Sequence, residues 1–436
     1  MGRVRTTMGA AALALAVAGA PGVARASGTA PEPLPTYRVA DGAKQVEGKP
    51  STADAPELVA GNAYTDKLGP GERVYRLVLK QDQSNVYVSA VVRPRPGAKI
   101  SYGDGIDVGV MTTAGRSCPA SNGHATFGYD AAPLSAVGVR WGAEDTDCAP
   151  GGVYYVKVTR TSAKGSDQSE WPLELRVQRE PGRGPGGPTA APSTWPSGAA
   201  TLPGNQAVGR SGGTGFNDAR ALGPGVWRDE LRPGQTRWYR VPLDWGQQLG
   251  LGAELAAARL TKQYGSASGG LAVSLYSPYR GLVSYEDASY DGKQAGVTLG
   301  KTAPVAYENR FASDKEVQRA SIAGWYYVAV TMGEKVAEFT EDATPVPLTL
   351  RLDVIGTPAK APAYKENLAA GGFGVDAQDR EAAEQGLTAP EAADAAGNAS
   401  VMRVVAGAGF GTGTVLLLVL GGWILLGRRG RAATSA

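Results

Sequence analysis

Histidine is nearly missing from this chain, which contains a single one, His124, among 436 residues. A Ser-His-Asp or Cys-His catalytic site would have to be built on that residue. His124 lies in the turn-like stretch 121–124, where a solvated loop residue is expected rather than a general base. One histidine and two cysteines also exclude the usual zinc sites. This inventory predicts a protein that is not an enzyme.

Long runs of one charge sign are also lacking. The chain has 44 Lys and Arg residues against 41 Asp and Glu residues, which gives a formal net charge of +3. Proteins that bind nucleic acid usually carry a basic stripe. We therefore expect no nucleic-acid partner.

No acidic stretch has the ligand spacing of an EF-hand, and no cofactor is expected. Calcium is the one metal worth weighing, because hard cations bind clustered carboxylates and carbonyls on loops. The stretches concerned are Asp104-Gly105-Ile106-Asp107, Glu144-Asp145-Thr146-Asp147, and Glu286-Asp287 with Asp291-Gly292. Ordinary solvated turns are the favoured interpretation of all three.

The amino terminus has the pattern of a cleaved signal peptide, over residues 1–26. Arg3 and Arg5 precede an uncharged, apolar stretch at 8–23, and Ala24-Arg25-Ala26 follows as a cleavage signal. The mature chain then begins near Ser27. A non-cleaved anchor is the competing interpretation, but the apolar stretch is short for a membrane span.

The carboxy terminus predicts one membrane-spanning helix at residues 403–427. Residues 404–426 contain no ionisable side chain and would cover about 34 Å as a helix, slightly more than a bilayer's hydrocarbon core. Three arginines follow at once, so the positive-inside rule places the tail at 428–436 in the cytoplasm. Both ends therefore predict a single-pass cell-membrane protein with its ectodomain outside.

Two further features depend on this topology. Gly407 and Gly411 form a G-x-x-x-G pair that would let two span helices pack closely, although glycine is also simply common in membrane helices. Cys118 and Cys148 are an even pair, and an exported chain reaches an oxidising compartment. We expect a disulfide between them, with two free buried thiols as the alternative.

The ectodomain contains an internal repeat, which defines two domains at 37–180 and 206–357. Both copies share the frame aromatic-x-Asp-x-Leu-x-Pro-Gly, followed by an aromatic residue and Arg before an apolar residue. The frame spans residues 64–77 and 227–241. Each copy ends with a Tyr-Tyr-Val strand, at 152–158 and 324–330, and a closing alternating strand, at 172–177 and 347–354. The repeat predicts a tandem duplication.

The pattern within each copy predicts an all-β fold of two tandem β-sandwich or jelly-roll domains. Short period-two strands alternate with turn residues, and no long amphipathic helix is present. In the closing strand Leu173, Leu175 and Val177 fall on one side, with Glu174 and Arg176 on the other. The Ala-rich stretch 249–260 has helical propensity, but its place in the repeat favours a strand.

Two tracts outside the repeats are poor in apolar residues. Residues 181–205 are rich in Gly, Pro, Ala and Ser and predict a flexible linker. Residues 358–402 are Ala-rich and mildly acidic, which predicts a disordered stalk with some transient helix.

The frame Asp-x-Leu-x-Pro-Gly and the strand Gly-x-Tyr-Tyr-Val-x-Val resemble bacterial pre-peptidase C-terminal-type domains. That resemblance implies jelly-roll sandwiches, which in that family are appended to secreted enzymes. The stretch 239–246 also resembles modules that follow von Willebrand A-type domains in surface proteins of high-GC Gram-positive bacteria. The Asp-x-Ser-x-Ser metal signature of the A domain itself is missing here.

Two partner classes fit these observations. A protein partner, in the membrane or in an envelope complex, is the first hypothesis. A wall glycan is the second, because exposed tyrosines form flat amphipathic contact surfaces. The candidate glycan-contact residues in a loop-rich stretch are Tyr276, Tyr279, Tyr285 and Tyr290.

Overall fold

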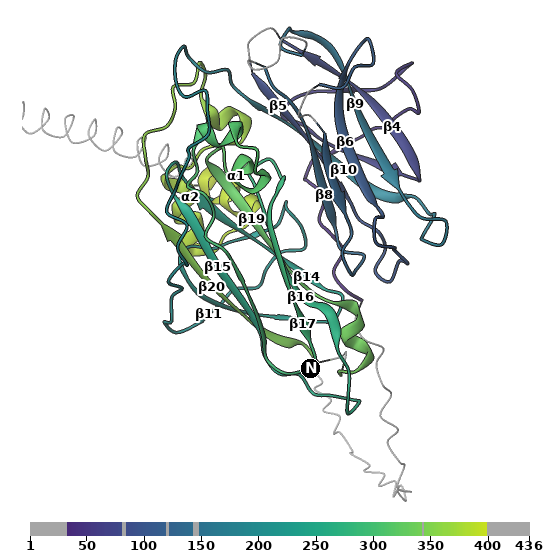
Figure 1. Cartoon of the computed structure of the whole chain (residues 1–436), viewed down its shortest axis with the longest axis vertical. Helices are drawn as coiled ribbons and strands as arrows, with labels where there is room; N and C mark the ends of the chain where they lie inside the picture. The colour runs from purple at the N-terminus through teal and green to yellow at the C-terminus, as the bar shows by residue number, and fades with distance from the viewer. Residues whose placement is uncertain (1–32, 81–83, 119–121, 143–147, 342–343, 399–436) are drawn as a thin grey trace, which may run out of the picture. The chain divides into compact units, whose positions relative to one another are not determined.

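The computed structural model describes residues 33–80, 84–118, 122–142, 148–341 and 344–398. It shows a mostly β protein with four five-stranded sheets (Figure 1). The predicted signal peptide at 1–26, the span at 403–427 with Gly407 and Gly411, and the tail at 428–436 lie outside the described residues. Within the described ranges, no helix combines the length and apolar character that crossing a membrane requires.

The first sandwich comprises ten strands in two sheets. One sheet has the order β1-β3-β10-β5-β8 and the other β2-β4-β9-β6-β7. The strands are β1 (Lys44–Gln45), β2 (Glu57–Leu58), β3 (Ala63–Leu68), β4 (Gly71–Leu79), β5 (Asn85–Val92), β6 (Gly105–Thr112), β7 (Gly123–Thr126), β8 (Leu134–Arg140), β9 (Gly152–Thr161) and β10 (Trp171–Glu180).

The second sandwich repeats this order strand for strand. Its sheets are β11-β13-β20-β15-β18 and β12-β14-β19-β16-β17. The strands are β11 (Val208–Gly209), β12 (Arg220–Ala221), β13 (Gly225–Leu231), β14 (Thr236–Leu243), β15 (Gln248–Leu255), β16 (Ala267–Tyr276), β17 (Leu282–Tyr290), β18 (Ala295–Leu299), β19 (Gly324–Met332) and β20 (Val346–Ile355). The tandem β-sandwich prediction is confirmed. Residues 249–255 of the Ala-rich stretch lie in strand β15, which ends before Ala256.

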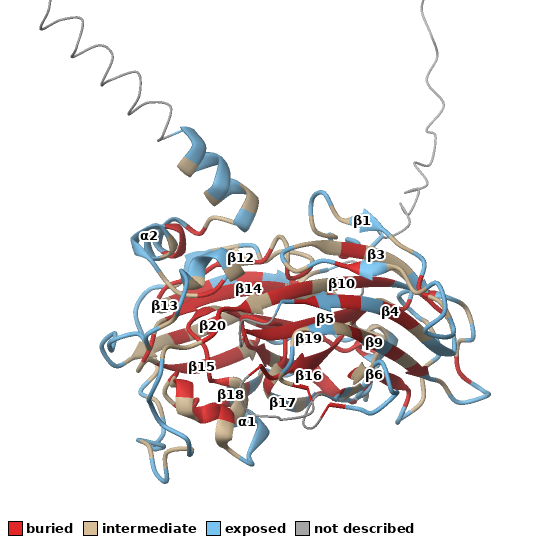
Figure 2. Cartoon of the chain, turned by 90° about the horizontal axis from the view of Figure 1, so that it is seen from above, coloured by how far each residue is buried: buried red, intermediate tan, exposed pale blue. Residues whose placement is uncertain are grey.

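Each sandwich closes around side chains from both of its sheets. In the first, Val88 and Ala90 of β5 pack in one cluster with Ile106 and Val108 of β6. The second has an equivalent cluster that includes residues of β15, β16 and β20. Figure 2 shows the resulting buried stretches along the central strands, including β5, β10, β14 and β19.

The Asp of the repeat frame makes the same polar contacts in both copies, which explains why the frame is shared. In the first copy Asp66 Oδ2 accepts hydrogen bonds from the Gly48 amide at 2.7 Å and the Tyr75 hydroxyl at 2.8 Å. In the second, Asp229 Oδ2 accepts from the Gly212 amide at 2.8 Å and the Tyr239 hydroxyl at 2.7 Å.

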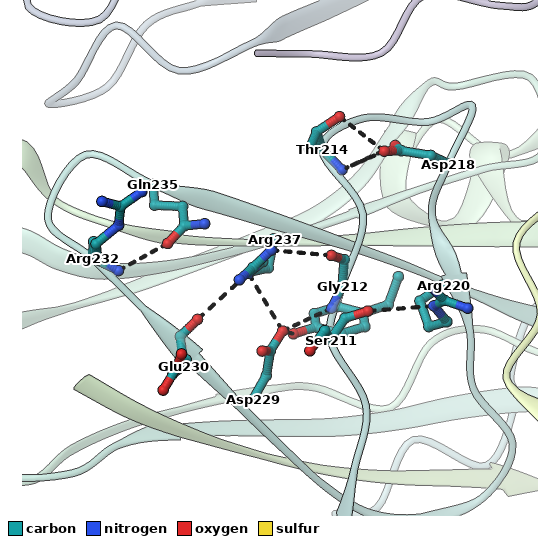
Figure 3. A network of polar contacts seen from close by, with 11 residues as sticks. Ser211, Gly212, Thr214, Asp218, Arg220, Asp229, Glu230, Arg232, Gln235 and Arg237 are labelled. Carbon is teal, nitrogen blue, oxygen red and sulfur yellow. Dashed lines mark hydrogen bonds and ion pairs between the residues drawn. The ribbon is translucent and has the colours of Figure 1, made fainter. Parts of the chain in front are cut away.

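The glycine in each contact is required by a close approach. A Cβ on Gly48 or Gly212 would lie 2.7 Å or 2.8 Å from the partner tyrosine ring. Figure 3 shows the second copy, where Arg237 also reaches Asp229, with 3.5 Å between Nε and Oδ2. The Asp in the frame therefore joins the incoming segment to the sheet and is used for folding.

Parts of the two tracts at 181–205 and 358–398 pack on the second sandwich. Trp195 packs against Ala303, Val317 and Ala320 of the second sandwich. The helical elements are η1 (Tyr307–Phe311), α1 (Lys315–Arg319), η2 (Glu334–Glu338), η3 (Leu368–Gly371) and α2 (Ala377–Gln385), and residues 389–398 are also helical.

Helix α2 is held to the second sandwich by polar contacts at its start and end. Trp325 Nε1 donates to Asp379 at 2.9 Å, and the Arg210 guanidinium donates to the backbone carbonyl oxygens of Glu384 and Gln385. Asp376 closes a capping box at its amino end. These contacts offset part of the conformational entropy that the segment loses when it becomes ordered.

Candidate functional site

The outer face of β10 is covered by the second sandwich. Leu173, Leu175 and Val177 point into the first core, as their alternation predicts. Glu174 and Glu180, on the opposite face, are nevertheless 0% exposed. Because a buried carboxylate must be paired, both point to specific contacts across the junction.

Glu174 is paired with Arg280, which lies in the tight turn between β16 and β17. The Arg280 Nη1 atom lies 2.6 Å from Glu174 Oε1, and both side chains are buried. Asn217 donates to the same carboxylate at 3.0 and 3.1 Å and accepts from Arg280 Nη2 at 2.7 Å. Arg280 has φ of +67°, a left-handed conformation that costs a non-glycine residue about 1 kcal/mol or more. The turn is therefore held in a strained form that presents this guanidinium.

Glu180 is paired with Arg310 of η1, again with both side chains fully buried. The Arg310 Nη2 atom lies 2.8 Å from Glu180 Oε1. The carboxylate also accepts from Asn85 at 2.8 Å, Tyr87 at 2.7 Å and Tyr364 at 2.8 Å. Burial alone would raise the pKa of the Glu180 carboxyl, but the Arg310 charge and the hydrogen bonds from Arg310, Asn85 and Tyr87 hold that pKa below its ordinary value.

Aromatic packing joins the sandwiches between these two ion pairs. Tyr87 of β5 stacks on Tyr279, with ring centroids 4.2 Å apart and planes 10° apart. Trp141 and Phe373 meet the same Tyr87 ring edge-on. The sandwiches thus share one continuous apolar cluster, which fixes the walls of any site along the junction.

A groove runs along this junction, and we call it the junction groove. Its main part is a cavity of about 470 Å³, and a second part of about 110 Å³ shares Asp130, Pro133 and Thr236 with it. Most of the lining residues come from segments 34–37, 93–97 and 126–134 and from the second sandwich at 233–238, 269–285 and 329–334.

The junction groove has both charge signs and two half-exposed aromatic rings. Arg93, Arg95, Asp130 and Glu334 line its larger part. Asp130 accepts from the Glu334 amide at 3.1 Å, and burial raises the pKa of its carboxyl. Tyr129 and Tyr285 are 51% and 40% exposed and line the smaller part. Burial, with Asp287 as a smaller contributor, raises the pKa of the Tyr285 hydroxyl.

Of the four tyrosines predicted as glycan contacts, three are buried. Tyr276 packs in a cluster with Phe216 and Trp238, and Tyr279 stacks on Tyr87. The Tyr290 hydroxyl donates to the backbone carbonyl of Ala256 at 2.6 Å. Only Tyr285 of the four is exposed enough to meet a ligand. The sequence pattern missed Tyr129, which stands in the bend at 129–130 and packs over Gly269.

The predicted disulfide is confirmed: Cys118 and Cys148 are bonded, with Cα atoms 5.8 Å apart. The bond ties the end of the β6 hairpin to the loop before β9. His124 is exposed in β7, and its Nδ1 atom lies 2.8 Å from Asp107 Oδ1 across the β6–β7 pair.

The acidic stretches weighed for calcium do not converge on a metal site among the described residues, which exclude 143–147. Asp104 instead accepts from the backbone amides of Ser101 at 2.8 Å and Ala163 at 2.7 Å. Although burial opposes it, hydrogen bonding lowers the pKa of this carboxyl. Asp104 thus joins two loops of the first sandwich.

No family model and no curated protein matches the chain. Among solved structures, the tandem CBM22 pair of Paenibacillus barcinonensis Xyn10C is 12% identical, covers 69% of this chain and 93% of its own, and has a TM-score of 0.18. The CUB1-EGF-CUB2 fragment of human MASP-1/3 is 7% identical, with coverages of 67% and 99% and a TM-score of 0.16. The ANX1 ectodomain of Arabidopsis thaliana is 9% identical, with coverages of 68% and 89% and a TM-score of 0.15. At these TM-scores none of the three assigns the chain a function.

Proposed function

We propose that the chain is a non-catalytic binding protein, anchored in the cell membrane with its two sandwiches outside, that holds a segment of a protein partner in the junction groove. The carrying observation is the pair of buried Arg–Glu contacts across the junction. They fix both walls of the groove before a ligand arrives, which lowers the entropy cost of binding.

The groove's lining favours a protein segment. Its larger part holds four charged side chains of both signs, which suits the mixed charge of a polypeptide. Its prolines, including Pro94, Pro96, Pro133 and Pro233, give walls that lose little freedom on binding. Three of the four tyrosines first considered for a glycan platform, Tyr276, Tyr279 and Tyr290, are buried.

The anchoring part of the proposal is supported by the residue patterns at both ends and by the disulfide, which persists in oxidising compartments. Fractionation of cells tests it. The full chain should sediment with membranes, resist alkaline extraction, lack residues 1–26 and be cut by protease added outside. Recovery from the cytosol with those residues still attached would overturn the topology.

A photo-crosslinking residue placed at Tyr129 in the full-length protein tests the binding part. Tyr102 and Tyr264 are matched controls, because they are 95% and 82% exposed and do not line the groove. We expect a discrete protein adduct from position 129 and none from 102 or 264. Equal labelling from all three positions contradicts a groove-specific partner.

A wall glycan is the second candidate, and one observation favours it. Tyr129 and Tyr285 are half-exposed in the same small pocket, with the Asp130 carboxylate beside them. Tyrosine faces pack against apolar ligand faces, and carboxylates accept hydroxyl hydrogen bonds. Cosedimentation of the full-length protein with purified wall glycan, lost in Tyr129→Ala but kept in Tyr102→Ala, would assign the groove to glycan instead.

Each sandwich is further proposed to be of the pre-peptidase C-terminal type. The support is the repeat frame, whose Asp makes the same contact with Tyr and Gly in both copies. An experimental structure with a different strand order would remove this assignment and leave the binding proposal intact.

A further inference from the structure

A second cavity, which we call the edge cavity, adjoins the junction groove on the first sandwich. Its volume is about 490 Å³. Arg93 and Pro172 line both the edge cavity and the larger part of the junction groove. The other walls of the edge cavity come mainly from segments 45–47 and 65–67. A bound segment that extends from one space into the other would therefore pass Arg93.

The Arg93 guanidinium is held in position but does not use all of its donors. Its Nη1 atom donates to the Tyr37 carbonyl oxygen at 3.1 Å, and its guanidinium carbon lies 4.9 Å from the centroid of the Tyr37 ring. The edge formed by Nε and Nη2 donates no hydrogen bond within the described part of the chain, and Nε is buried. Because a buried donor without an acceptor costs free energy, this edge indicates a missing acceptor.

The carboxylates that line the edge cavity are bound to other groups. Glu170 lies 3.5 Å from Arg73 Nη2, and Glu47 lies 3.5 Å from Lys49 Nζ. Asp66 is used in the contact of the repeat frame. None of the three forms an ion pair with the arginine between the two cavities.

The charge of Arg93 is only partly compensated at the junction. Burial lowers the pKa of its guanidinium, while Tyr37 and Glu174 act in the opposite direction. Glu174 is itself paired with Arg280, with 2.6 Å between Oε1 and Nη1. The residues that the structure describes therefore leave the Arg93 cation without an ion pair of its own.

Arg95 is a second cation in the larger part of the junction groove. It is exposed and follows Arg93 by two positions in the stretch 93–96, which reads Arg-Pro-Arg-Pro. The two prolines restrict the backbone, so the spacing between the two arginine Cα atoms varies little. Asp130 and Glu334 also line the groove, but within the described ranges neither forms an ion pair with either arginine.

We propose that the segment held in the junction groove is acidic, with one carboxylate side chain on the Nε–Nη2 edge of Arg93 and a second near Arg95. This inference rests on the proposed function, because it concerns the same groove. A carboxylate meets such an edge through two parallel charge-assisted hydrogen bonds. A neutral segment would leave the charge of Arg93 unpaired.

Selection of displayed random peptides on the purified full-length protein tests this proposal. We expect the bound peptides to be enriched in Asp and Glu. Bound peptides without that enrichment would overturn the acidic assignment and leave the proposed function standing, because the protein then still holds a segment. Absence of any bound peptide, together with absence of the adduct from position 129, would overturn the proposed function itself.

Variants of the full-length protein locate the contact, with the tightest selected peptide as the probe. Arg93→Gln should weaken its binding about tenfold or more, and Arg95→Gln, at an exposed position, about threefold. Arg228→Gln is the control, because Arg228 is an exposed arginine of β13 that lines neither cavity, and it should leave the affinity unchanged. Equal affinity in Arg95→Gln and Arg228→Gln would overturn the proposal even if Arg93→Gln failed to fold.

A change on the peptide completes a double-mutant cycle with Arg93. Replacing the acidic residues of the peptide by their amides should weaken binding to the wild type about tenfold or more and have little further effect on Arg93→Gln. Equal weakening for both proteins would place the peptide's acids away from Arg93 and overturn the assignment.

The chain's own Glu32 is the alternative source of a carboxylate. It precedes the groove-lining segment 34–37 in the sequence and lies outside the described residues. Glu32→Gln should leave the affinity for the acidic peptide unchanged. A gain of about tenfold in this variant would show that the chain's own acid occupies the Arg93 edge, which overturns the assignment to a partner.

Discussion

Strands β10 and β20 occupy the same place in the two sandwiches but have different outer faces. Their inward leucines match, and each has proline at its second position. Glu174 and Glu180 of β10 are fully buried, whereas the corresponding Thr349 and Ile355 of β20 are half-buried. The residue types on the inner face of each strand thus depend on the core of its own sandwich. The residue types on the outer face depend on whether a neighbouring domain covers that face.

The connections before the ninth strand of each copy differ in a second way. In the first sandwich the loop between β8 and β9 is tied by the Cys118–Cys148 bond. In the second, the connection between β18 and β19 holds η1 and α1, and Arg310 of η1 reaches the first sandwich. One copy is stabilised by a covalent bond, and the other contributes the contacts that join the pair.

The largest loss is expected from Arg310→Ala, which leaves Glu180 buried without its cation. Breaking such a pair costs about 3 to 5 kcal/mol in the free energy of unfolding. Denaturant unfolding of the full-length protein measures it. Arg38→Ala is the control, because the Arg38–Asp41 pair is 49% and 67% exposed and should contribute less than about 1 kcal/mol. Similar losses in both variants would show that the buried pair does not couple the sandwiches.

Replacing both Cys118 and Cys148 by serine should destabilise the first sandwich alone. The bond closes a sequence separation of 30 residues, for which chain entropy predicts about 3 to 4 kcal/mol. Hydrogen exchange read by mass spectrometry should then show faster exchange in β6 and β9 and unchanged exchange in β16 and β19. Equal acceleration in both copies would mean that they unfold as one unit.

Asp66→Asn and Asp229→Asn test the feature that the copies share. Each replaces a charged acceptor that receives a tyrosine hydroxyl and a backbone amide, so each should cost about 2 kcal/mol. Thermal unfolding of the two variants measures the losses. A large inequality between them would show that the contact has different roles in the two copies.

The smallest expected effect is the pH dependence of stability that comes from the junction ion pair of Glu180. Because the folded-state pKa of Glu180 is lowered, its ion pair contributes stability above the unfolded pKa of about 4.3 and loses it as the pH falls through the folded value. The stability difference between the wild type and Glu180→Gln should therefore shrink below about pH 4. Unfolding curves from pH 7 to pH 3 measure it, and a difference that grows on acidification would contradict the assigned sign.

The repeat, the strands and the disulfide could be predicted because each depends on local pattern or on compartment. The alternation of side chains along a strand places Leu173 and Leu175 in the core of the first sandwich, independently of what covers the other face of the sheet. The same alternation does not show whether the other face of the sheet contacts water or a second sandwich. From the sequence alone, Glu174 is therefore predicted to face solvent. A comparison of the two copies could have indicated the difference, because β10 has glutamates at the positions where β20 has Thr349 and Ile355.

The aromatic residues of the second sandwich were harder to place. Pro278 and the surrounding polar residues suggest an exposed loop, but β16 and β17 pair here around a tight turn, which buries Tyr276 and Tyr290. The composition of residues 358–398 likewise did not indicate the helical elements that this segment contains. Its visible local signal was Asp376 followed three residues later by Asp379, which forms the capping box of α2.

The two crossing ion pairs have a consequence for how many copies such an array holds. Each pair uses a carboxylate of β10 and a guanidinium from the following copy. Strand β20 has no acids at the matching positions, and the linker residue Pro203 accepts there from Arg351. A third copy placed against β20 would therefore not meet the two carboxylates that β10 offers to the second copy.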